Sequence, residues 1–598
     1  MEASETASAP DHPGDGLFPY ERIRPGQDRF LEDARNCLAS RTHLLAHAPT
    51  GLGKTAVSLA AGMERASEEG GCLLFLTSKQ SQHHAAVEAL RHIRRRRRVT
   101  AVDMVAREDM CLAMRKEGMP CLEGGQCYFR NRLVEEAAAR LLQYPLHVQE
   151  AKRLCLRLGT CPYLASQRAL GSADCAVCDY NQAFSMAGEG ALRRTGRPVG
   201  RTVMVVDEAH NLPARISEGH SFALGERELA LAMGEPRMRM FRDDLEAVRQ
   251  VLLGMASKGN GRQVEAWELD EALEERCGTG CAGLAGEMLR EMGESGSRRC
   301  SEVVGFLRNW SCFGAGSARF LEGPGPRLRT LLLDVSLVSA PVLEEVHGAL
   351  LMSGTLHPPE MFAEVLGLED RCACRRYASP FPPENRALLA VTGVSSRFQS
   401  RGEEMYQSIS RRIAQVAQAA PGNMAVFFPS YEFMSAVTRQ LRSLPMPKQV
   451  MADSRELGKN ERDAMVQEMR REGERALFAP IGGSFAEGVD FRDNLLSAVV
   501  VVGLPIPPPS EDLERRMRWL GDRHSPAKAR LYAQIYPSIS KVLQAAGRAI
   551  RSEGDRAAVV LLDDRYLLRP VADALPEDFR PVRSRGLTAE LEAFFSPT

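Results

Sequence analysis

The segment from His43 to Thr55, HLLAHAPTGLGKT, most narrowly limits what this chain can fold into. Its apolar run at 44–48 predicts a buried strand, and TGLGKT at 50–55 predicts a phosphate-binding loop that opens a helix. Gly51 and Gly53 lack the Cβ atoms that would keep the backbone amides away from a polyphosphate. Those amides and the positive end of the following helix would form a cradle for an anion.

Three side chains of this loop have expected roles in holding a nucleotide. Lys54 would reach the β- and γ-phosphates, Thr55 would be a ligand of Mg²⁺, and Thr50 would line the loop with the two glycines. Ala48 stands where the usual pattern has its first glycine. The alternative is a glycine turn that binds no ligand, but GKT directly after an apolar strand favours a nucleotide.

An acidic pair follows a second apolar run, TVMVV at 202–206. Asp207 and Glu208 would stand at the carboxyl end of this predicted strand, where parallel sheets hold the metal of a nucleotide. Asp207 would bind Mg²⁺, and Glu208 would polarise the attacking water. DEAH alone could be surface residues that start a helix, but together with GKT it predicts a nucleoside triphosphatase.

Length and composition bound the remaining possibilities. A chain of 598 residues should hold several domains, and its 44% hydrophobic and 26% charged residues are ordinary for a globular protein. No apolar stretch approaches the roughly 20 residues of a membrane span. Residues 1–16 are polar and read as a disordered tail, so we expect a cytoplasmic protein without a membrane partner. The net charge of zero requires that any nucleic acid be bound by local patches.

Fifteen cysteines in such a chain suggest metal or thiol chemistry rather than disulfides. Seven lie close together in the sequence: Cys111, Cys121, Cys127, Cys155, Cys161, Cys175 and Cys178. The last two form a CxxC, but ADCAVCDYNQAF alternates like a strand and would place their sulfurs on opposite faces. Cys155 falls on an apolar helical stripe at 148–158, which favours a place in the core.

After the acidic pair, the sequence pattern of the chain changes twice. Residues 220–342 predict a helical insertion, with helices at Glu226–Met233, Arg242–Met255, Ala266–Glu275 and Glu287–Met292. Residues from 387 onward predict a second α/β unit, with strands at Met424–Phe428, Ala476–Phe478, Ala498–Val502 and Ala557–Leu562.

Three further patterns suggest contacts with ligands. Gln544, Arg548 and Arg551 recur at i, i+4 and i+7, so one helical face would offer an amide and two guanidiniums to a γ-phosphate; a surface helix with spaced arginines is the alternative. Gln27 could read an adenine edge or could simply start a polar helix. The segment 77–79 could contact a nucleic-acid backbone, whereas the arginine run at 94–98 fits a solvated surface at least as well.

The order of motifs resembles that of the iron–sulfur XPD/DinG group of superfamily-2 helicases, and most closely archaeal XPD. The matching segments extend from about residue 18 to 566 and are FPY, RPGQ, APTGLGKT, CLLFLTS, REDMC, GTCPY, ADCAVCDYNQAF, VVDEAHN, MSGTL, NMAVFFPSYEFM, FAEGVDF and QAAGRAIR. The resemblance implies an α/β fold with two RecA-like parallel-sheet domains. A small iron–sulfur domain and a helical Arch domain would both be inserted in the first of them.

The implied boundaries follow the motifs. RecA-like domain 1 would occupy 17–100, 171–219 and 343–386, the iron–sulfur domain 101–170, the Arch 220–342 and RecA-like domain 2 387–598.

The resemblance also assigns residues to roles. Lys54, Thr55, Asp207 and Glu208 would form the hydrolytic core, completed from the second domain by Gln544, Arg548 and Arg551. Gln27 would contact adenine, and Thr355 and Asp490 would link the nucleotide state to the cleft between the domains. Cys111 and Cys161 match the first and last ligands of a 4Fe–4S cluster. We expect Cys121 and Cys127 as the other two, because they bound a loop with Gly124 and Gly125, and keep Cys155 in reserve. Zinc is the rival metal.

The implied activity is that of an ATP-dependent DNA helicase that uses ATP, Mg²⁺ and a 4Fe–4S cluster. It would move 5′ to 3′ on single-stranded DNA, open forked duplex DNA, act as a monomer and serve DNA repair, with repair proteins as possible partners. One alternative is a translocase or remodeller on DNA or RNA that does not separate strands. The other is a scaffold with a vestigial nucleotide site.

Overall fold

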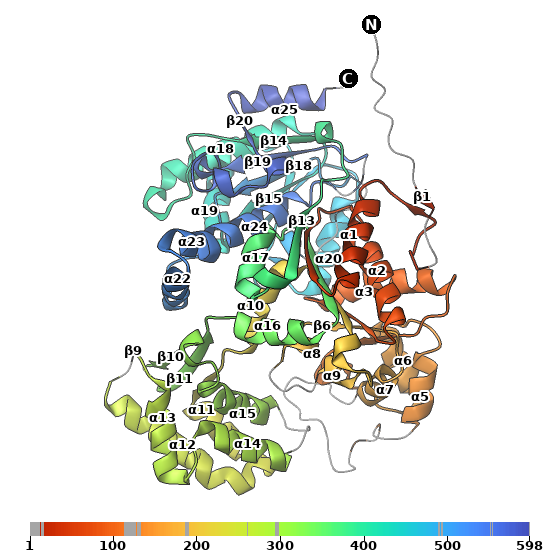
Figure 1. Ribbon diagram of the computed structural model, residues 1–598. Coiled ribbons are helices and arrows are strands. Elements are labelled where there is room, and N and C mark those ends of the chain that lie inside the picture. The colour runs from red at the N-terminus through yellow and green to blue at the C-terminus, as the bar shows by residue number, and fades with distance from the viewer. Residues whose placement is uncertain are drawn as a thin grey trace.

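Two parallel sheets form the body of the molecule (Figure 1). The computed structural model describes residues 12–13, 17–112, 127, 129, 133–185, 190–259, 261–292, 298–323, 325–487, 491, 494–550, 552 and 554–596. In Figure 1 the second domain lies at the top, the insertion between the two halves of the first domain lies at the lower left, and helices α5–α7 lie at the lower right.

The first sheet has seven parallel strands in the order β13-β3-β12-β7-β4-β6-β5. Their bounds are β3 His43–His47, β4 Leu73–Thr77, β5 Ala101–Met104, β6 Cys175–Asp179, β7 Val203–Asp207, β12 Gly348–Ser353 and β13 Cys372–Arg376. Leu350 of β12 pairs with Leu44 on one side and with Val205 on the other. The strand that leads to the glycine loop and the strand that leads to the acidic pair therefore end at the same edge of the sheet.

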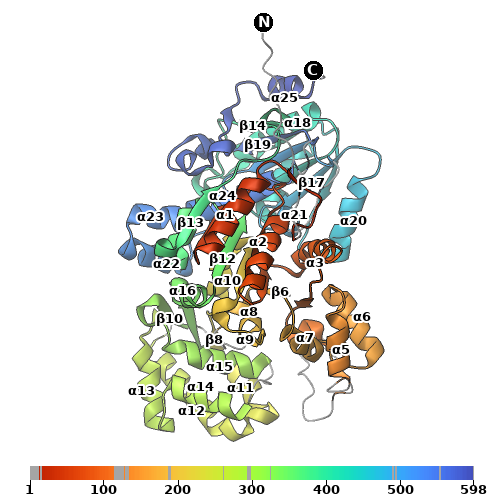
Figure 2. The ribbon, with the colours of Figure 1, turned by 45° about the vertical axis from the view of Figure 1, so that its right-hand side comes forward.

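Helices cover both faces of this sheet. α1 (Gln27–Ala39), α2 (Lys54–Glu68) and α3 (Gln80–Arg94) share a core with one face, and Figure 2 shows them in front of it. The other face packs against α10 (Leu212–Gly219), α16 (Ser336–Glu345) and α17 (Pro359–Leu366). The same core takes in α5 (Val134–Leu141), α6 (Val148–Leu158) and α7 (Pro162–Leu170).

Two predicted boundaries differ from the structure. The segment 101–104, expected in the iron–sulfur domain, is edge strand β5 of the first sheet, because all four of its residues are buried beside β6. The segment 336–345, expected in the Arch, is α16 of the first domain, where Val338 and Leu343 lie in the core.

The insertion has a hydrophobic core of its own. Its helices are α11 (Glu226–Met233), α12 (Arg242–Ser257), α13 (Ala266–Cys277), α14 (Cys281–Met292) and α15 (Arg298–Trp310). It also contains a four-stranded antiparallel sheet that the helical prediction missed, made of β8 (Ala223–Gly225), β11 (Arg327–Leu332), β10 (Ser317–Glu322) and β9 (Arg262–Gln263). The β10–β11 hairpin alternates, since Phe320 faces one small core while Leu321 faces the helices.

The second sheet also has seven parallel strands, in the order β16-β17-β15-β18-β19-β14-β20. Their bounds are β14 Arg386–Ala390, β15 Met424–Phe428, β16 Gln449–Ala452, β17 Arg475–Pro480, β18 Ala498–Val502, β19 Ala557–Leu562 and β20 Val582–Arg583. The four strands expected here are confirmed, as are the two parallel-sheet, RecA-like domains. Helices α18 (Glu403–Ala419), α19 (Tyr431–Leu441) and α25 (Leu587–Phe595) share a core with one face, and α24 (Tyr536–Ala546) packs on the other.

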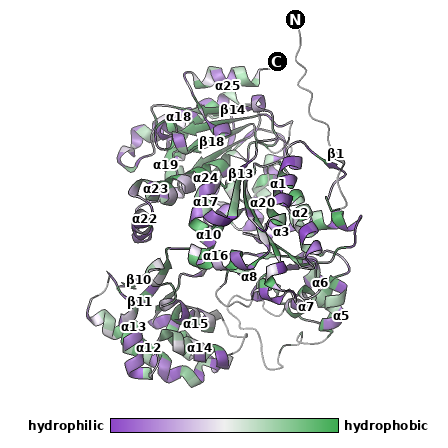
Figure 3. Ribbon diagram, in the orientation of Figure 1, coloured by the Kyte–Doolittle hydropathy of each residue, from purple (hydrophilic) through white to green (hydrophobic). Residues whose placement is uncertain are grey.

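Polarity separates the interior from the surface. In Figure 3 the strands of the second sheet are mostly green, whereas α22 (Glu511–Arg523) is almost entirely purple. Across the residues that the structure describes, no helix is both long and apolar enough to span a bilayer.

Candidate nucleotide site in the inter-domain cleft

The glycine loop has the conformation that its sequence predicts. It links β3 to α2, and Gly51 and Gly53 have φ angles of 87° and 79°, in the left-handed region that favours glycine. A Cβ atom on Gly53 would lie 2.2 Å from Nε2 of Gln27, and one on Gly51 would lie 2.1 Å from the ring of Phe381. A side chain at Gly53 would therefore push Gln27 away from the loop, and one at Gly51 would push the ring of Phe381 away.

Gln27 holds the phosphate-binding loop in place through hydrogen bonds with backbone groups. Its Nε2 donates to the carbonyl of Leu52 at 2.9 Å, and its Oε1 accepts from the backbone N–H of Arg24 at 2.9 Å. The guanidinium of Arg24 in turn donates to the carbonyl of Gly51 at 3.1 Å. Gln27 thus holds the backbone of the phosphate loop, and its contact with adenine stays a prediction.

Asp207 and Glu208 lie at the end of β7, close enough to Lys54 for its charge to affect both carboxylates. Burial, with the charge of Glu208 added to it, raises the pKa of Asp207 to about 7, while Lys54 acts in the opposite direction. Burial would also raise the pKa of Glu208, but a hydrogen bond with His210 and the charge of Lys54 outweigh it and lower that pKa. A divalent cation beside Asp207 would stabilise its ionised form, so this donor fits the expected Mg²⁺.

A chain of hydrogen bonds leads from Glu208 into the second domain. Oγ of Ser353 donates to Oε2 of Glu208 at 2.8 Å and lies 2.7 Å from Nδ1 of His210. Nε2 of His210 lies 2.5 Å from Nε2 of Gln544 on α24, so the imidazole of His210 lies between the two domains. His210 closes the DEAH motif, so its signal was present in the sequence although its role was not predicted.

A second contact runs beside the first. The backbone N–H of Thr355 donates to Oγ of Ser353 at 3.0 Å, and its carbonyl accepts from Oγ of Ser540 on α24 at 3.2 Å. The predicted coupling position Thr355 therefore touches the second domain directly.

The arginines of the second domain are arranged differently from the prediction. Helix α24 ends at Ala546, so Arg548 lies in the following turn and shares no helical face with Gln544. In this turn the N–H of Arg548 bonds to the carbonyl of Ala545 at 3.2 Å. Nε of Arg548 donates to the carbonyl of Ala486 at 2.7 Å. Arg551 and Asp490 lie outside the described residues.

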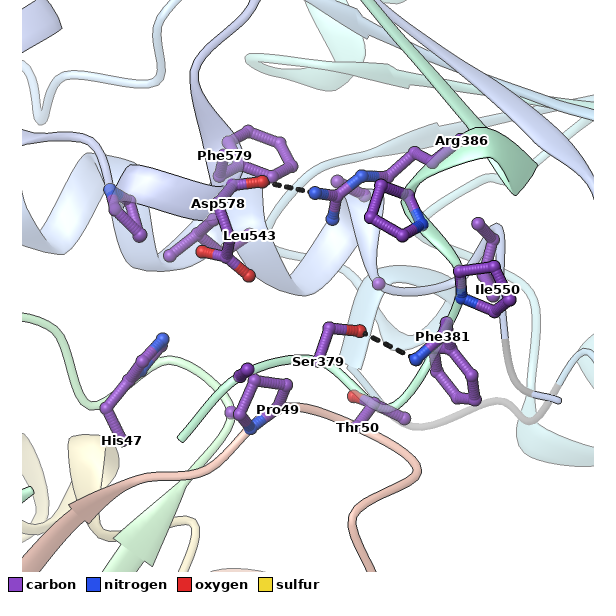
Figure 4. A pocket seen from close by; sticks show the side chains of 17 residues that line it. His47, Pro49, Thr50, Ser379, Phe381, Arg386, Leu543, Ile550, Asp578 and Phe579 are labelled. Atoms are coloured by element: carbon purple, nitrogen blue, oxygen red, sulfur yellow. Dashed lines mark hydrogen bonds between the residues drawn. The ribbon is translucent and has the colours of Figure 1, made fainter. Parts of the chain in front are cut away.

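A cavity of about 300 Å³ opens between the two domains next to the phosphate loop (Figure 4). Pro49 and Thr50 lie on its lower side, and Leu543 and Ile550 lie above them in the second domain. Phe381, from the segment that joins the two sheets, closes one end. The cleft thus has room for a ligand beside the anion cradle.

The cysteines divide as the sequence suggested. Cys175 and Cys178 are buried and belong to the cores on opposite faces of β6, and Cys155 is buried on the apolar stripe of α6. Cys111, Cys127 and Cys161 are partly exposed.

The three partly exposed thiols lie in one region of the molecule. Burial raises the pKa of Cys161, and the thiols of Cys111 and Cys127 are near enough to raise it further. Cys121 lies outside the described residues. Within the described part of the chain no three metal-binding side chains converge into a metal site, but the soft thiol donors fit the chemistry of an iron–sulfur cluster.

Comparison with known proteins agrees with this architecture. Residues 75–229 match the DEAD_2 family model and residues 413–582 match the Helicase C-terminal domain model, which together cover more than half of the chain. The ATP-dependent DNA helicase XPD of Sulfolobus acidocaldarius is 24% identical over 91% of this chain and 96% of its own length. The ATP-dependent DNA helicase chl1 of Aspergillus fumigatus is 25% identical over 77% of this chain and 72% of its own.

Solved structures show the same fold. An XPD helicase structure matches 94% of this chain and 99% of its own with a TM-score of 0.65 at 21% identity, and the Xpd4 structure of S. tokodaii matches with a TM-score of 0.57 at 16% identity. The two family models and the curated relatives show that the chain is a superfamily-2 helicase. The chain belongs to the XPD/DinG/CHL1 type of that superfamily.

Proposed function

We propose that this protein is an ATP-dependent DNA helicase. The observation that carries the proposal is the chain from Glu208 through Ser353 and His210 to Gln544, because it joins the residue expected to polarise water to a helix of the other domain. The names of the two curated relatives agree with this activity.

The residues on either side of the cleft have complementary roles in hydrolysis. The amides at 51–54 and the ammonium of Lys54 would bind the phosphates, and Glu208 would orient the attacking water. Asp207 and Thr55 would hold Mg²⁺, which neutralises phosphate charge when bound. From the second domain, Arg548 and Arg551 would offset the charge that develops in the transition state.

Hydrolysis would be coupled to movement through the contacts of α24. Closing the cleft would bring Arg548 toward the phosphates, and release of phosphate would loosen the contacts at His210 and Thr355. The segment 77–79, at the exit of β4 and the start of α3, would hold the DNA backbone in one of these states. Such contacts do not read sequence and weaken with salt.

We also propose that a 4Fe–4S cluster is held by Cys111, Cys121, Cys127 and Cys161. When bound, the cluster would fix the fold around helices α5–α7. Movement from 5′ to 3′, forked DNA as substrate, a monomeric state and a role in DNA repair in the cytoplasm stay predictions from the family resemblance.

The ATPase rate with and without single-stranded DNA tests the proposal, measured beside displacement of a labelled strand. We expect DNA to stimulate hydrolysis and the strand to be released only with ATP. Stimulated hydrolysis without strand release would favour a translocase or remodeller instead. No hydrolysis at all would leave only a scaffold with a vestigial site.

A further inference from the structure

His83 lies at the centre of a buried junction inside the first domain. It is the fourth residue of α3 and is fully buried. Its Nδ1 lies 2.5 Å from Oδ1 of Asp103 on β5, and its Nε2 lies 3.5 Å from Oδ1 of Asp179 at the end of β6. A histidine between two carboxylates is stabilised as the imidazolium, so the junction is ionic.

The first partner, Asp103, connects the junction to the cysteine-bearing helices. Its Oδ2 accepts from the backbone N–H of Val148 at 2.8 Å, the first residue of α6. His147, at the N-cap of that helix, lies 3.8 Å from the same oxygen. A buried carboxylate thus sits at the positive end of α6, next to α7, whose N-cap is Cys161.

The second partner, Asp179, connects the junction to the acidic pair. The next residue is Tyr180, which is buried, and its hydroxyl lies 2.5 Å from the carbonyl of Asp207 and 2.9 Å from the carbonyl of Glu208. The position of the Asp207–Glu208 backbone therefore depends on Tyr180.

The opposite end of the junction is the expected DNA contact. Lys79 is the N-cap of α3, and Oγ of Ser78 hydrogen-bonds with Gln82 at 3.2 Å. His83 follows directly, so a shift of the segment 77–79 moves the helix turn that carries it. Helix α3 packs against β5 and β6, and α6 packs against β5 (Figures 1 and 2).

We propose that His83 is a positioning residue that couples DNA contact at the start of α3 to hydrolysis at Asp207 and Glu208. Asp103 extends the same coupling to α5–α7. The inference rests on the proposed function and deepens it, because it names a route by which DNA stimulates the ATPase. A buried ion pair contributes little net stability compared with apolar side chains of similar volume, so a role in geometry explains the pair better than stability does.

The paired substitution H83L/D103L separates these roles. Each single substitution breaks the buried ion pair and should lower the melting temperature. The double variant should recover part of that loss, because it removes both charges of the pair but also removes the acceptor of the Val148 N–H. The double variant should hydrolyse ATP at the basal wild-type rate and bind a labelled oligonucleotide as tightly as wild type. Its maximal stimulation by DNA should fall about tenfold, in the range expected for coupling residues.

Two further variants serve as a control and as an independent test of the coupling. K448M/E474Q removes an ion pair of the second domain, bonded at 2.6 Å, in which Lys448 is buried and Glu474 is exposed, and should keep full stimulation. Tyr180→Phe removes only the hydroxyl beside Asp207 and Glu208, and should lose stimulation even if H83L/D103L does not fold.

The possible results lead to different conclusions. Wild-type stimulation in H83L/D103L, or in Tyr180→Phe, overturns the coupling role while leaving the proposed function intact. An unmodified protein whose ATPase does not respond to DNA would instead refute the proposed function itself.

Discussion

Lys54 and Arg548 come from opposite domains and are both proposed to act on the nucleotide, so each tests a different half of the proposed site. Removing Lys54 takes away the cation expected on the β- and γ-phosphates, and removing Arg548 takes away charge that offsets the transition state. We expect Lys54→Ala and Arg548→Ala to reduce ATP turnover by on the order of a thousandfold, while single-stranded DNA is still bound. Arg455→Ala, which changes an arginine in an exposed ion pair, is the control. Near-normal turnover in either variant would contradict that assignment.

His83 makes stability depend on pH in a defined direction. Burial opposes its protonation, but Asp103 and Asp179 outweigh burial and raise its pKa to about 9, while the nearby His147 has its pKa lowered by burial. The folded state therefore favours the protonated ring. This contribution is complete below about pH 6.5 and is lost as the pH rises through 9. Its size is on the order of 3 kcal/mol.

Thermal unfolding of wild type and H83L/D103L at several pH values measures this effect. The melting temperature of wild type should fall relative to that of the double variant between pH 7 and about 9. Parallel curves for the two proteins would show that His83 carries no such proton.

The four proposed cluster ligands give a colour test. Protein purified without oxygen should contain iron and absorb near about 400 nm. Single Cys→Ser changes should bleach it at Cys111, Cys121, Cys127 and Cys161. The changes should have no such effect at the buried Cys155, Cys175 and Cys178. If Cys155→Ser bleaches the protein and Cys121→Ser does not, the assignment based on the apolar stripe of α6 is wrong. If the purified protein is colourless and contains zinc, zinc replaces the cluster.

Among the elements, α22 makes contacts that its sequence does not suggest. None of its side chains is buried, yet it joins the second domain to the insertion. Asp512 accepts two hydrogen bonds from Arg329 of β11, at 2.7 and 3.1 Å, and Arg523 donates to Asp334 at 2.5 Å. The insertion is thereby tied to the domain that is expected to move.

Weakening these ties should affect strand separation more than hydrolysis. We expect D512N/R523Q to slow displacement of a duplex severalfold while keeping DNA-stimulated ATPase activity, because neither residue lines the phosphate loop. Arg518→Gln, at an exposed position of the same helix, serves as the matched control. Equal loss of both activities would show that α22 has another role.

Elements with strong local signals were predictable, and those defined by distant partners were not. The strands before the glycine loop and the acidic pair are continuous apolar runs, as buried parallel strands require. By contrast, β13 is half exposed and β9 has two residues, so neither carries a period that distinguishes it from a loop. The contact of Gln544 with His210 joins residues 334 positions apart, and that of His83 with Asp103 joins residues 20 positions apart. No local sequence pattern predicts either contact.

At the scale of the molecule, direct contacts already bridge the cleft between the two domains. Gln544 and Ser540 contact the motifs of the first domain, and Glu364 of α17 bonds to Lys528 and Tyr532 of the second domain at 3.0 and 2.7 Å. The proposed movement along DNA would require the two domains to exchange these contacts for others as the nucleotide changes.

Strand displacement on a forked duplex tests this account most directly. The measurement compares otherwise identical forks whose single-stranded tail is either 5′ or 3′, with ATP and with a non-hydrolysable analogue. We predict release of the labelled strand with ATP alone and only from the fork with the 5′ tail. Release from the 3′-tailed fork alone would contradict the 5′-to-3′ direction of movement that the family resemblance implies. ATP hydrolysis with no release from either fork would contradict the central claim that this protein is a helicase.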